Sequence, residues 1–190
     1  MANYPVANPK VIQRAREVLA LNPLFLDTET TGTGPADLIC EISIVDAQGN
    51  ALFDHLVNPG RPIPPETSAV HGITDANVAN EPRWPELWPE VEALLKDRVI
   101  AVYNAEFDMR LLRQTTLAYK LPWTLLMDQA FCMMKLFSAY YGEWNPRYNG
   151  FVSHKLEFAG KLCGLKEQNT HHAVDDARIT AELLQYLAKA

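Results

Sequence analysis

The chain has 190 residues, of which 48% are apolar and 21% are charged, a composition that favours one globular domain with its own core. Its net charge of −6 argues against a protein that holds long duplex DNA by neutralising phosphates. Any contact with nucleic acid therefore has to be local or carried by metal ions. The three cysteines stand singly, without a C-x-x-C pair, so we expect reduced thiols in the core and neither a disulfide framework nor a structural zinc site.

The N-terminus lacks the apolar stretch of a signal peptide, and no segment reaches the about 20 apolar residues that span a membrane. We therefore expect a cytoplasmic protein that does not interact with membranes. No repeat, linker or low-complexity tract divides the chain, so residues 1–190 are expected to form a single domain, with residues 1–22 as a helical extension.

Hydrophobic periodicity gives the elements in chain order. Strands are predicted at 23–29, 38–47, 51–57, 99–103 and 123–127, with the turn "AQGN" joining the second strand to the third. Helices are predicted at 66–70, 84–96, 105–119, 129–140, 154–163 and 173–189. Three antiparallel strands followed by strand–helix alternation predict an α/β fold with one mixed five-stranded sheet flanked by helices.

Two carboxylates, Asp27 and Glu29, directly follow an apolar run in the first strand. Residues i and i+2 share a face of a strand, so these side chains point the same way, and Thr28 points oppositely. On its own this pattern is also compatible with carboxylates that cap the following turn, "TTGTGP".

A third carboxylate lies on the apolar stripe of the helix predicted at 105–119. An advance of about 100° per residue places Asp108 on the core side. Glu106 falls on the opposite side, where Arg110 is a suitable ion-pair partner four residues on.

The last helix repeats this pattern, since its apolar stripe includes Asp176, whereas Asp175 lies with Arg178 on the solvent side. Four inward carboxylates from three segments are difficult to satisfy except with cations. Oxygen ligands favour Mg²⁺ or Mn²⁺, and two ions about 3.5–4 Å apart could activate a water and stabilise the leaving oxygen of a phosphodiester.

Four segments, "FLDTETTG", "HGIT", "YNAEFDMRLL" and "HHAVDDA", resemble in order the motifs of the DnaQ-like 3′–5′ exonucleases of DEDDh type. The resemblance spans about residues 24–187 and implies a ribonuclease-H-like fold. It also implies that Asp27, Glu29, Asp108 and Asp176 are catalytic metal ligands.

The resemblance further implies that His171 is the general base. His171 precedes the helix that carries Asp176, and imidazole titrates in the range that suits proton transfer at neutral pH. His172 is the competitor, but the H-x-A-x-x-D-A register selects His171.

Other residues in or beside these motifs are candidates for substrate binding. His71 lies in the family segment that lines the terminal-nucleotide pocket, although a hydrogen-bonded loop histidine is an equal alternative. One departure from the family pattern is Tyr103, where many relatives have histidine before the Asn-Ala pair. The substrate-binding candidates in these motifs are Thr28, Thr30, His71, Asn104 and Phe107.

Residues 138–153 interleave tyrosines and Trp144 with one arginine. Such a segment can stack unpaired bases, and Trp144 is the candidate for that role. Alternatively, the rings pack against one another or form a dimer contact. Glu41, in the second strand, is expected to make a structural hydrogen bond.

Together these features predict a metal-dependent 3′–5′ exonuclease that releases nucleoside 5′-monophosphates from single-stranded nucleic acid, with DNA favoured over RNA. The alternatives are an RNA-trimming or oligoribonuclease-type exonuclease and a non-catalytic, nucleic-acid-binding polymerase-accessory module. The sequence offers a complete set of metal ligands and a general base, which a non-catalytic module would not need, and this argues against the latter alternative. A polymerase partner and a homodimer are both compatible with the sequence.

Overall fold

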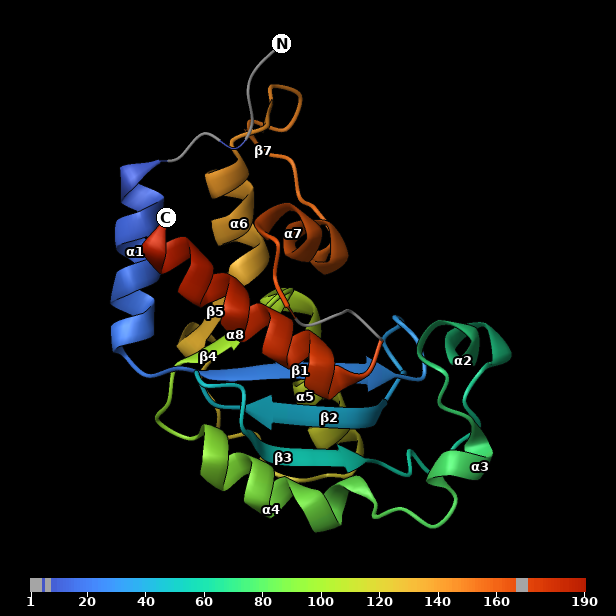
Figure 1. The fold of residues 1–190 in the computed structure, drawn as a ribbon. Helices are drawn as coiled ribbons and strands as arrows, with labels where there is room; N and C mark the ends of the chain where they lie inside the picture. Colours follow the sequence, from blue (N-terminus) through green and yellow to red (C-terminus); the bar gives the residue numbers. More distant parts are fainter. Residues whose placement is uncertain (1–4, 6–7, 167–170) are drawn as a thin grey trace.

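The computed structural model describes residue 5 and residues 8–166 and 171–190. Its five-stranded sheet has the order β3-β2-β1-β4-β5 (Figure 1). β1 pairs antiparallel with β2 and parallel with β4, β2 pairs antiparallel with β3, and β4 pairs parallel with β5. The predicted mixed sheet is therefore confirmed. The strands are β1 (Leu24–Thr30), β2 (Ile39–Val45), β3 (Ala51–Leu56), β4 (Ile100–Val102) and β5 (Ala130–Cys132).

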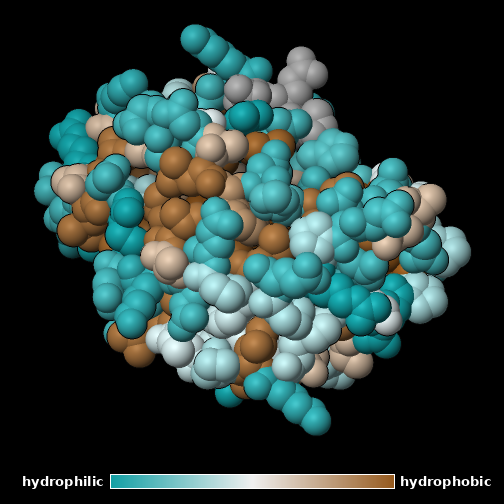
Figure 2. All heavy atoms as spheres, turned by 90° about the horizontal axis from the view of Figure 1, so that it is seen from below, coloured by the Kyte–Doolittle hydropathy of each residue, from teal (hydrophilic) through white to brown (hydrophobic). Residues whose placement is uncertain are grey.

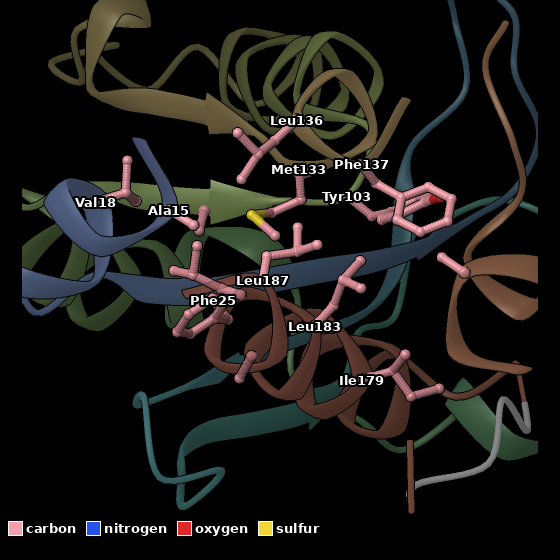
Figure 3. Packing of buried hydrophobic residues seen from close by; sticks show 14 of the residues in the cluster. Ala15, Val18, Phe25, Tyr103, Met133, Leu136, Phe137, Ile179, Leu183 and Leu187 are labelled. Atoms are coloured by element: carbon pink, nitrogen blue, oxygen red, sulfur yellow. The ribbon is translucent and has the colours of Figure 1, made fainter. Parts of the chain in front are cut away.

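Helices cover both faces of this sheet (Figure 1). On one face, Phe25 of β1 packs into a buried cluster with α1 (Pro9–Ala20), α6 (Met133–Tyr141), α7 (Leu156–Cys163) and α8 (Ala173–Lys189), as Figure 3 shows for Leu183, Leu187 and their neighbours. On the other face, Leu24 and Leu26 pack against α4 (Trp84–Leu95) and α5 (Ala105–Ala118). Because successive side chains of β1 point to opposite faces of the sheet, Phe25 belongs to one cluster, and Leu24 and Leu26 belong to the other.

The predicted N-terminal helix is α1, which starts at Pro9 after Asn8, whose side chain accepts a hydrogen bond from the Lys10 N–H. Its buried residues Val11, Ala15 and Val18 belong to the same cluster as Phe25. The helix is consequently part of the core and packs against α8. The rest of the predicted extension, residues 1–4 and 6–7, lies outside the described residues.

The prediction of the fifth strand at 123–127 was wrong, because β5 is Ala130–Cys132 and the predicted helix at 129–140 begins only at Met133. The apolar run before β5 has another role. Trp123 stacks on Trp88 of α4, with ring centroids 5.8 Å apart. Leu126 and Met127 remain exposed on the described surface, and Figure 2 shows apolar side chains gathered on the side of the molecule that carries α4. Packing on a helix therefore explains this run without sheet pairing.

The remaining elements are short. α2 (Pro65–His71) and α3 (Asp75–Val78) lie at one end of the sheet (Figure 1), and a 3-10 turn covers Met127–Gln129. A small hairpin of β6 (Trp144–Asn145) and β7 (Gly150–Phe151) follows α6. α3 and this hairpin were not predicted, since two to four residues show no periodicity. None of the described helices combines the length and apolarity needed to cross a membrane.

Candidate active site

Three of the predicted carboxylates converge where β1 ends and α8 begins. α8 crosses the face of the sheet toward which Asp27 and Glu29 point, and the C-terminal end of β1 lies beside the first turn of α8 (Figure 1). One carboxylate oxygen each from Asp27, Glu29 and Asp176 lies within 4.8 Å of the others. The two periodicities that predicted these directions are therefore confirmed for this trio.

The fourth carboxylate, Asp108, approaches from α5, on the opposite face of the sheet. It is buried, as predicted, and one of its oxygens accepts a hydrogen bond from Thr28 Oγ1 at 2.8 Å. Asp108 stands outside the 4.8 Å group, although its charge acts on Asp27. The Thr28 side chain points away from the trio and thus holds Asp108 on the opposite face of the sheet.

The electrostatics of the site favour a bound cation. Burial, followed by the charges of Asp108, Asp176 and Glu29, raises the pKa of Asp27 well above its ordinary value. Burial and the neighbouring carboxylates raise the pKa of Glu29 to about 8. Burial also raises the pKa of Asp108 to about 7, against the opposing hydrogen bonds from Thr28. These carboxylates repel one another, and a hard divalent cation bound to their oxygens would relieve that repulsion.

Glu41 of β2 holds the start of α8. It lies directly opposite Glu29 in the strand register, which places both side chains on one face. Its carboxylate accepts a hydrogen bond from the Ala173 N–H at 2.9 Å and contacts His172 Nδ1 at 3.3 Å. The predicted structural hydrogen bond of Glu41 is confirmed. Its charge also raises the pKa of Asp27 and Glu29, an effect that the sequence did not reveal because the strand register was unknown.

The two adjacent histidines differ in their surroundings. His172 is the N-terminal cap residue of α8 and contacts Glu41. His171 is exposed, and its backbone φ of 58° lies in the left-handed region, where histidine is found more often than most non-glycine residues. This conformation turns the chain directly before α8.

The two carboxylates expected on the solvent side, Glu106 and Asp175, differ in their exposure. Glu106 is exposed, whereas Asp175 is half-buried and accepts a hydrogen bond from Arg178 Nη1 at 3.3 Å. Arg110 does not take the predicted partner: its guanidinium donates to the Gln114 side chain and to the Thr33 carbonyl. Thr33 belongs to the loop after β1, and the Gln114 side chain donates to the Gly34 carbonyl of the same loop at 3.1 Å, so Arg110 is directed toward this loop.

The loop after β1 is fixed by short hydrogen bonds. Thr30 Oγ1 donates to the Gly32 carbonyl at 2.7 Å, and the Asp37 carboxylate accepts hydrogen bonds from Thr31 Oγ1 and the Gly34 N–H. A Cβ atom on Gly32 would lie 2.6 Å from the Asp37 carboxylate, so a larger residue here would displace Asp37 from its hydrogen bonds with Thr31 and Gly34.

His71, at the end of α2, is buried and ties this helix to the end of β1. Its Nδ1 accepts a hydrogen bond from the Ile73 N–H at 3.1 Å, so Nε2 carries the proton and donates to the Thr30 carbonyl at 3.3 Å. Burial lowers the pKa of His71, which favours this neutral form. The hydrogen-bonded alternative for His71 is thus the arrangement seen here.

The other substrate-binding candidates lie at two separate places. Asn104 is the N-cap residue of α5, and Phe107, one turn later, lies under the guanidinium of Arg110 at 5.3 Å. Trp144 is 49% exposed on the β6–β7 hairpin, and its ring contacts Phe151 edge-on with centroids 5.2 Å apart. Within residues 138–153 the structure therefore shows both internal ring packing and an exposed ring.

The raised pKa values predict how metal-free protein responds to pH. Glu29 has an ordinary pKa of 4.5 and a folded-state pKa of about 8, so its contribution to stability is fully present below pH 4.5 and is lost as pH rises toward 8. Mn²⁺ or Mg²⁺ binds the deprotonated carboxylates and should reverse this loss. At one fixed metal concentration, chosen as about 100 times the Kd at pH 8, we expect the metal to raise Tm by about 5–10 °C at pH 8 and by less at pH 5, where protons compete for the carboxylates.

Thermal unfolding in EDTA and in Mn²⁺, measured across this pH range, checks the prediction. Glu29→Gln removes one of the repelling charges, so this variant should be more stable than wild type in EDTA at pH 8 and should gain less from the metal. A metal-induced shift that is equal at pH 5 and pH 8 would contradict the electrostatic interpretation.

Comparisons with known proteins agree with this geometry. The model of the exonuclease family RNase_T matches residues 24–184. The chain is 36% identical over 189 residues to the uncharacterized exonuclease CP81 of Escherichia phage 186, covering 97% of both proteins. It is 33% identical over 162 residues to DNA polymerase III subunit epsilon of Treponema pallidum, covering 83% of this chain and 72% of that protein.

Other relatives are longer, and this chain spans 26% of a putative bifunctional exonuclease/endonuclease protein of Mycobacterium tuberculosis. Among solved structures, that of exonuclease X in complex with 5′ overhanging duplex DNA is 27% identical, with a TM-score of 0.66 and coverage of 88% of this chain and 92% of that one. The sheet order, the carboxylate trio and these matches lead to one assignment: the chain belongs to the exonuclease family, as a DnaQ-like nuclease with a ribonuclease-H-like fold.

Proposed function

We propose that this exonuclease removes nucleotides from the 3′ end of single-stranded nucleic acid, DNA in preference to RNA, and releases nucleoside 5′-monophosphates. The convergence of carboxylate oxygens from Asp27, Glu29 and Asp176 within 4.8 Å carries the proposal, because this chemistry is suited to phosphodiester hydrolysis assisted by divalent cations. Asp108, held by Thr28, completes the set from the other face.

Asp27, Glu29, Asp108 and Asp176 would hold two Mg²⁺ or Mn²⁺ ions. When bound, such ions neutralise charge on the phosphodiester and lower the pKa of water. Oxygen donors alone form the trio, which fits these hard cations better than zinc.

His171 is proposed as the general base that accepts a proton from the attacking water. It is exposed directly before α8, five residues from Asp176, and therefore has access to a substrate bound over the carboxylates. His172 is less suited to this role because its Nδ1 contacts Glu41, which also binds the start of α8.

The preference for DNA is supported by the relatives, which include a polymerase III epsilon subunit and an exonuclease solved with DNA. A single strand is favoured because a net charge of −6 leaves little broad attraction for a duplex. A polymerase partner or a second copy of this chain would supply further contacts.

The direct test uses single-stranded DNA and RNA oligonucleotides labelled at the 5′ end, with Mg²⁺ or Mn²⁺. The proposal predicts a ladder that shortens one nucleotide at a time and nucleoside 5′-monophosphates as products, with DNA degraded faster. Faster degradation of RNA would instead identify an RNA-trimming enzyme. Binding without turnover in either metal would favour a non-catalytic accessory role.

Trp144 gives a separate prediction about substrate binding. If its exposed ring stacks on unpaired bases, Trp144→Ala should weaken binding of single-stranded DNA by about 1–3 kcal/mol, without changing metal affinity. Fluorescence anisotropy in Ca²⁺ measures this effect. Tyr186→Ala serves as the control, because Tyr186 is another partly exposed ring, on α8. Equal Kd values for wild type and Trp144→Ala would assign the hairpin rings to packing or to a dimer contact.

A further inference from the structure

Two surface hollows meet at the segment Ser153–Lys155, between the β6–β7 hairpin and α7. The first runs from Tyr103 and Asn104 to this segment, and the second continues from it to Phe158 and Lys161 of α7. Both hollows are lined by Ser153, His154 and Lys155 and therefore adjoin along this segment, and we call the two together the 153–155 groove.

The groove adjoins the elements that carry the candidate active site. Asn104, which lines the first hollow, caps the helix that carries Asp108, and its carbonyl accepts the Asp108 N–H at 3.3 Å. In the second hollow, Lys161 lowers the pKa of Glu157, with smaller contributions of the same sign from His171 and Lys155, so the first turn of α7 lies near His171. These two relations place the groove beside the elements that carry the candidate active site.

The lining of the groove suits an unpaired nucleotide strand. The His154 ring stacks on Phe158, with centroids 4.7 Å apart and planes 23° apart, and Phe158 is 38% exposed. Tyr141 supports both rings edge-on. Lys155 is exposed, whereas Lys161 is paired with Glu157 at 2.6 Å, so Lys155 is the better placed of the two to attract a phosphate. A flat ring pair beside a cation is a stacking surface for bases.

Tyr103 anchors the wall of the groove. Its ring is buried at the end of β4, and its hydroxyl donates a hydrogen bond to the His154 carbonyl at 2.7 Å. The hydroxyl thus fixes Ser153–Lys155 to the strand next to β1.

We infer that the 153–155 groove binds the nucleotides on the 5′ side of the scissile phosphate, with a base on the His154–Phe158 ring pair and a phosphate at Lys155. Tyr103 is a positioning residue for this groove. The inference rests on the proposed function, since it takes the single strand as the ligand and the carboxylates as the place of hydrolysis.

The experiment measures binding, so that it does not depend on turnover. The Kd values of a fluorescent thymidine dinucleotide and of an octanucleotide are compared in Ca²⁺. Lys155→Gln and Phe158→Ala should each raise the Kd of the octanucleotide about tenfold and that of the dinucleotide less than about twofold. Lys155→Arg, which keeps the positive charge, should bind the octanucleotide with the wild-type Kd. Tyr103→Phe, which keeps the ring, should show a smaller change of the same kind.

Lys135→Gln is the matched control, because Lys135 lines a different hollow together with Lys10, Arg14 and Phe131. It should leave both Kd values unchanged. If Lys135→Gln weakens the octanucleotide and Lys155→Gln does not, the strand crosses that other hollow and the inference is wrong. Equal loss for both ligands in Lys155→Gln would also overturn it. A length-dependent loss in a protein that hydrolyses nothing would support the groove and contradict the proposed function.

Discussion

Asp176→Ala is expected to lower kcat by about 10³-fold or more, whereas Asp175→Ala should stay within about threefold of wild type. The two aspartates are adjacent on α8, yet Asp176 is buried and Asp175 is half-buried and paired with Arg178. Asp176 is 8% exposed and contributes an oxygen to the carboxylate trio. Asp175 is a hydrogen-bond partner of Arg178. Charge stabilisation by bound metal contributes several kcal/mol to the transition state, which is the source of the expected loss.

The same contrast applies to the other segments. Asp27→Ala, Glu29→Ala and Asp108→Ala should each show a loss comparable to that of Asp176→Ala, while Glu106→Ala, an exposed carboxylate of α5, should be nearly silent. Rates are measured on a labelled single strand with saturating Mn²⁺, and circular dichroism verifies folding. Equal losses in folded Asp175→Ala and Asp176→Ala would contradict the assignment of the inward face.

Local periodicity was sufficient to predict which carboxylates turn inward. On β1 the period of two puts Asp27 and Glu29 on the face of α8, and on α8 the period of 3.6 puts Asp176 beside them. These directions depend only on neighbours in sequence. They can therefore be predicted without the strand register or the packing of the helices.

What periodicity could not supply is the relation between the two faces of the sheet. The trio and Asp108 come from opposite faces of the sheet, and Asp108 is held on its own face by the hydrogen bond from Thr28, the residue between Asp27 and Glu29. Glu41 was likewise assigned a structural role alone, because only the register of β1 and β2 places it opposite Glu29. Such relations depend on which elements pack together, and the periodicity of a single sequence does not predict which elements those are.

The fifth strand shows the ambiguity of short apolar runs. Residues 123–127 and Ala130–Cys132 are both apolar, and the shorter run forms the strand because it pairs in parallel with β4. Trp123 instead stacks on Trp88. Length and hydrophobicity alone do not distinguish a strand from a segment that packs on a helix.

His171→Ala is expected to lower kcat by about 10²–10⁴-fold, the usual range for loss of a general base. Only neutral imidazole accepts a proton, so the wild-type rate should rise with pH, and this rising limb of the pH–rate profile should be absent in the variant. His172→Ala is the matched control. It removes the contact with Glu41 Oε1, while the bond from the Ala173 N–H to Glu41 remains, so its loss should be modest.

A second process would also give a rate that rises with pH. In the metal-free protein the pKa of Glu29 is raised to about 8 and that of Asp108 to about 7, so protons compete with the metal at these carboxylates. The two limbs separate when the metal concentration is varied. Excess Mn²⁺ moves the carboxylate limb to lower pH, whereas a limb due to His171 stays in place. Two results would show that His171 is not the proton acceptor. One is a rising limb that shifts with metal concentration and persists in His171→Ala. The other is a large loss of rate in His172→Ala while His171→Ala remains active.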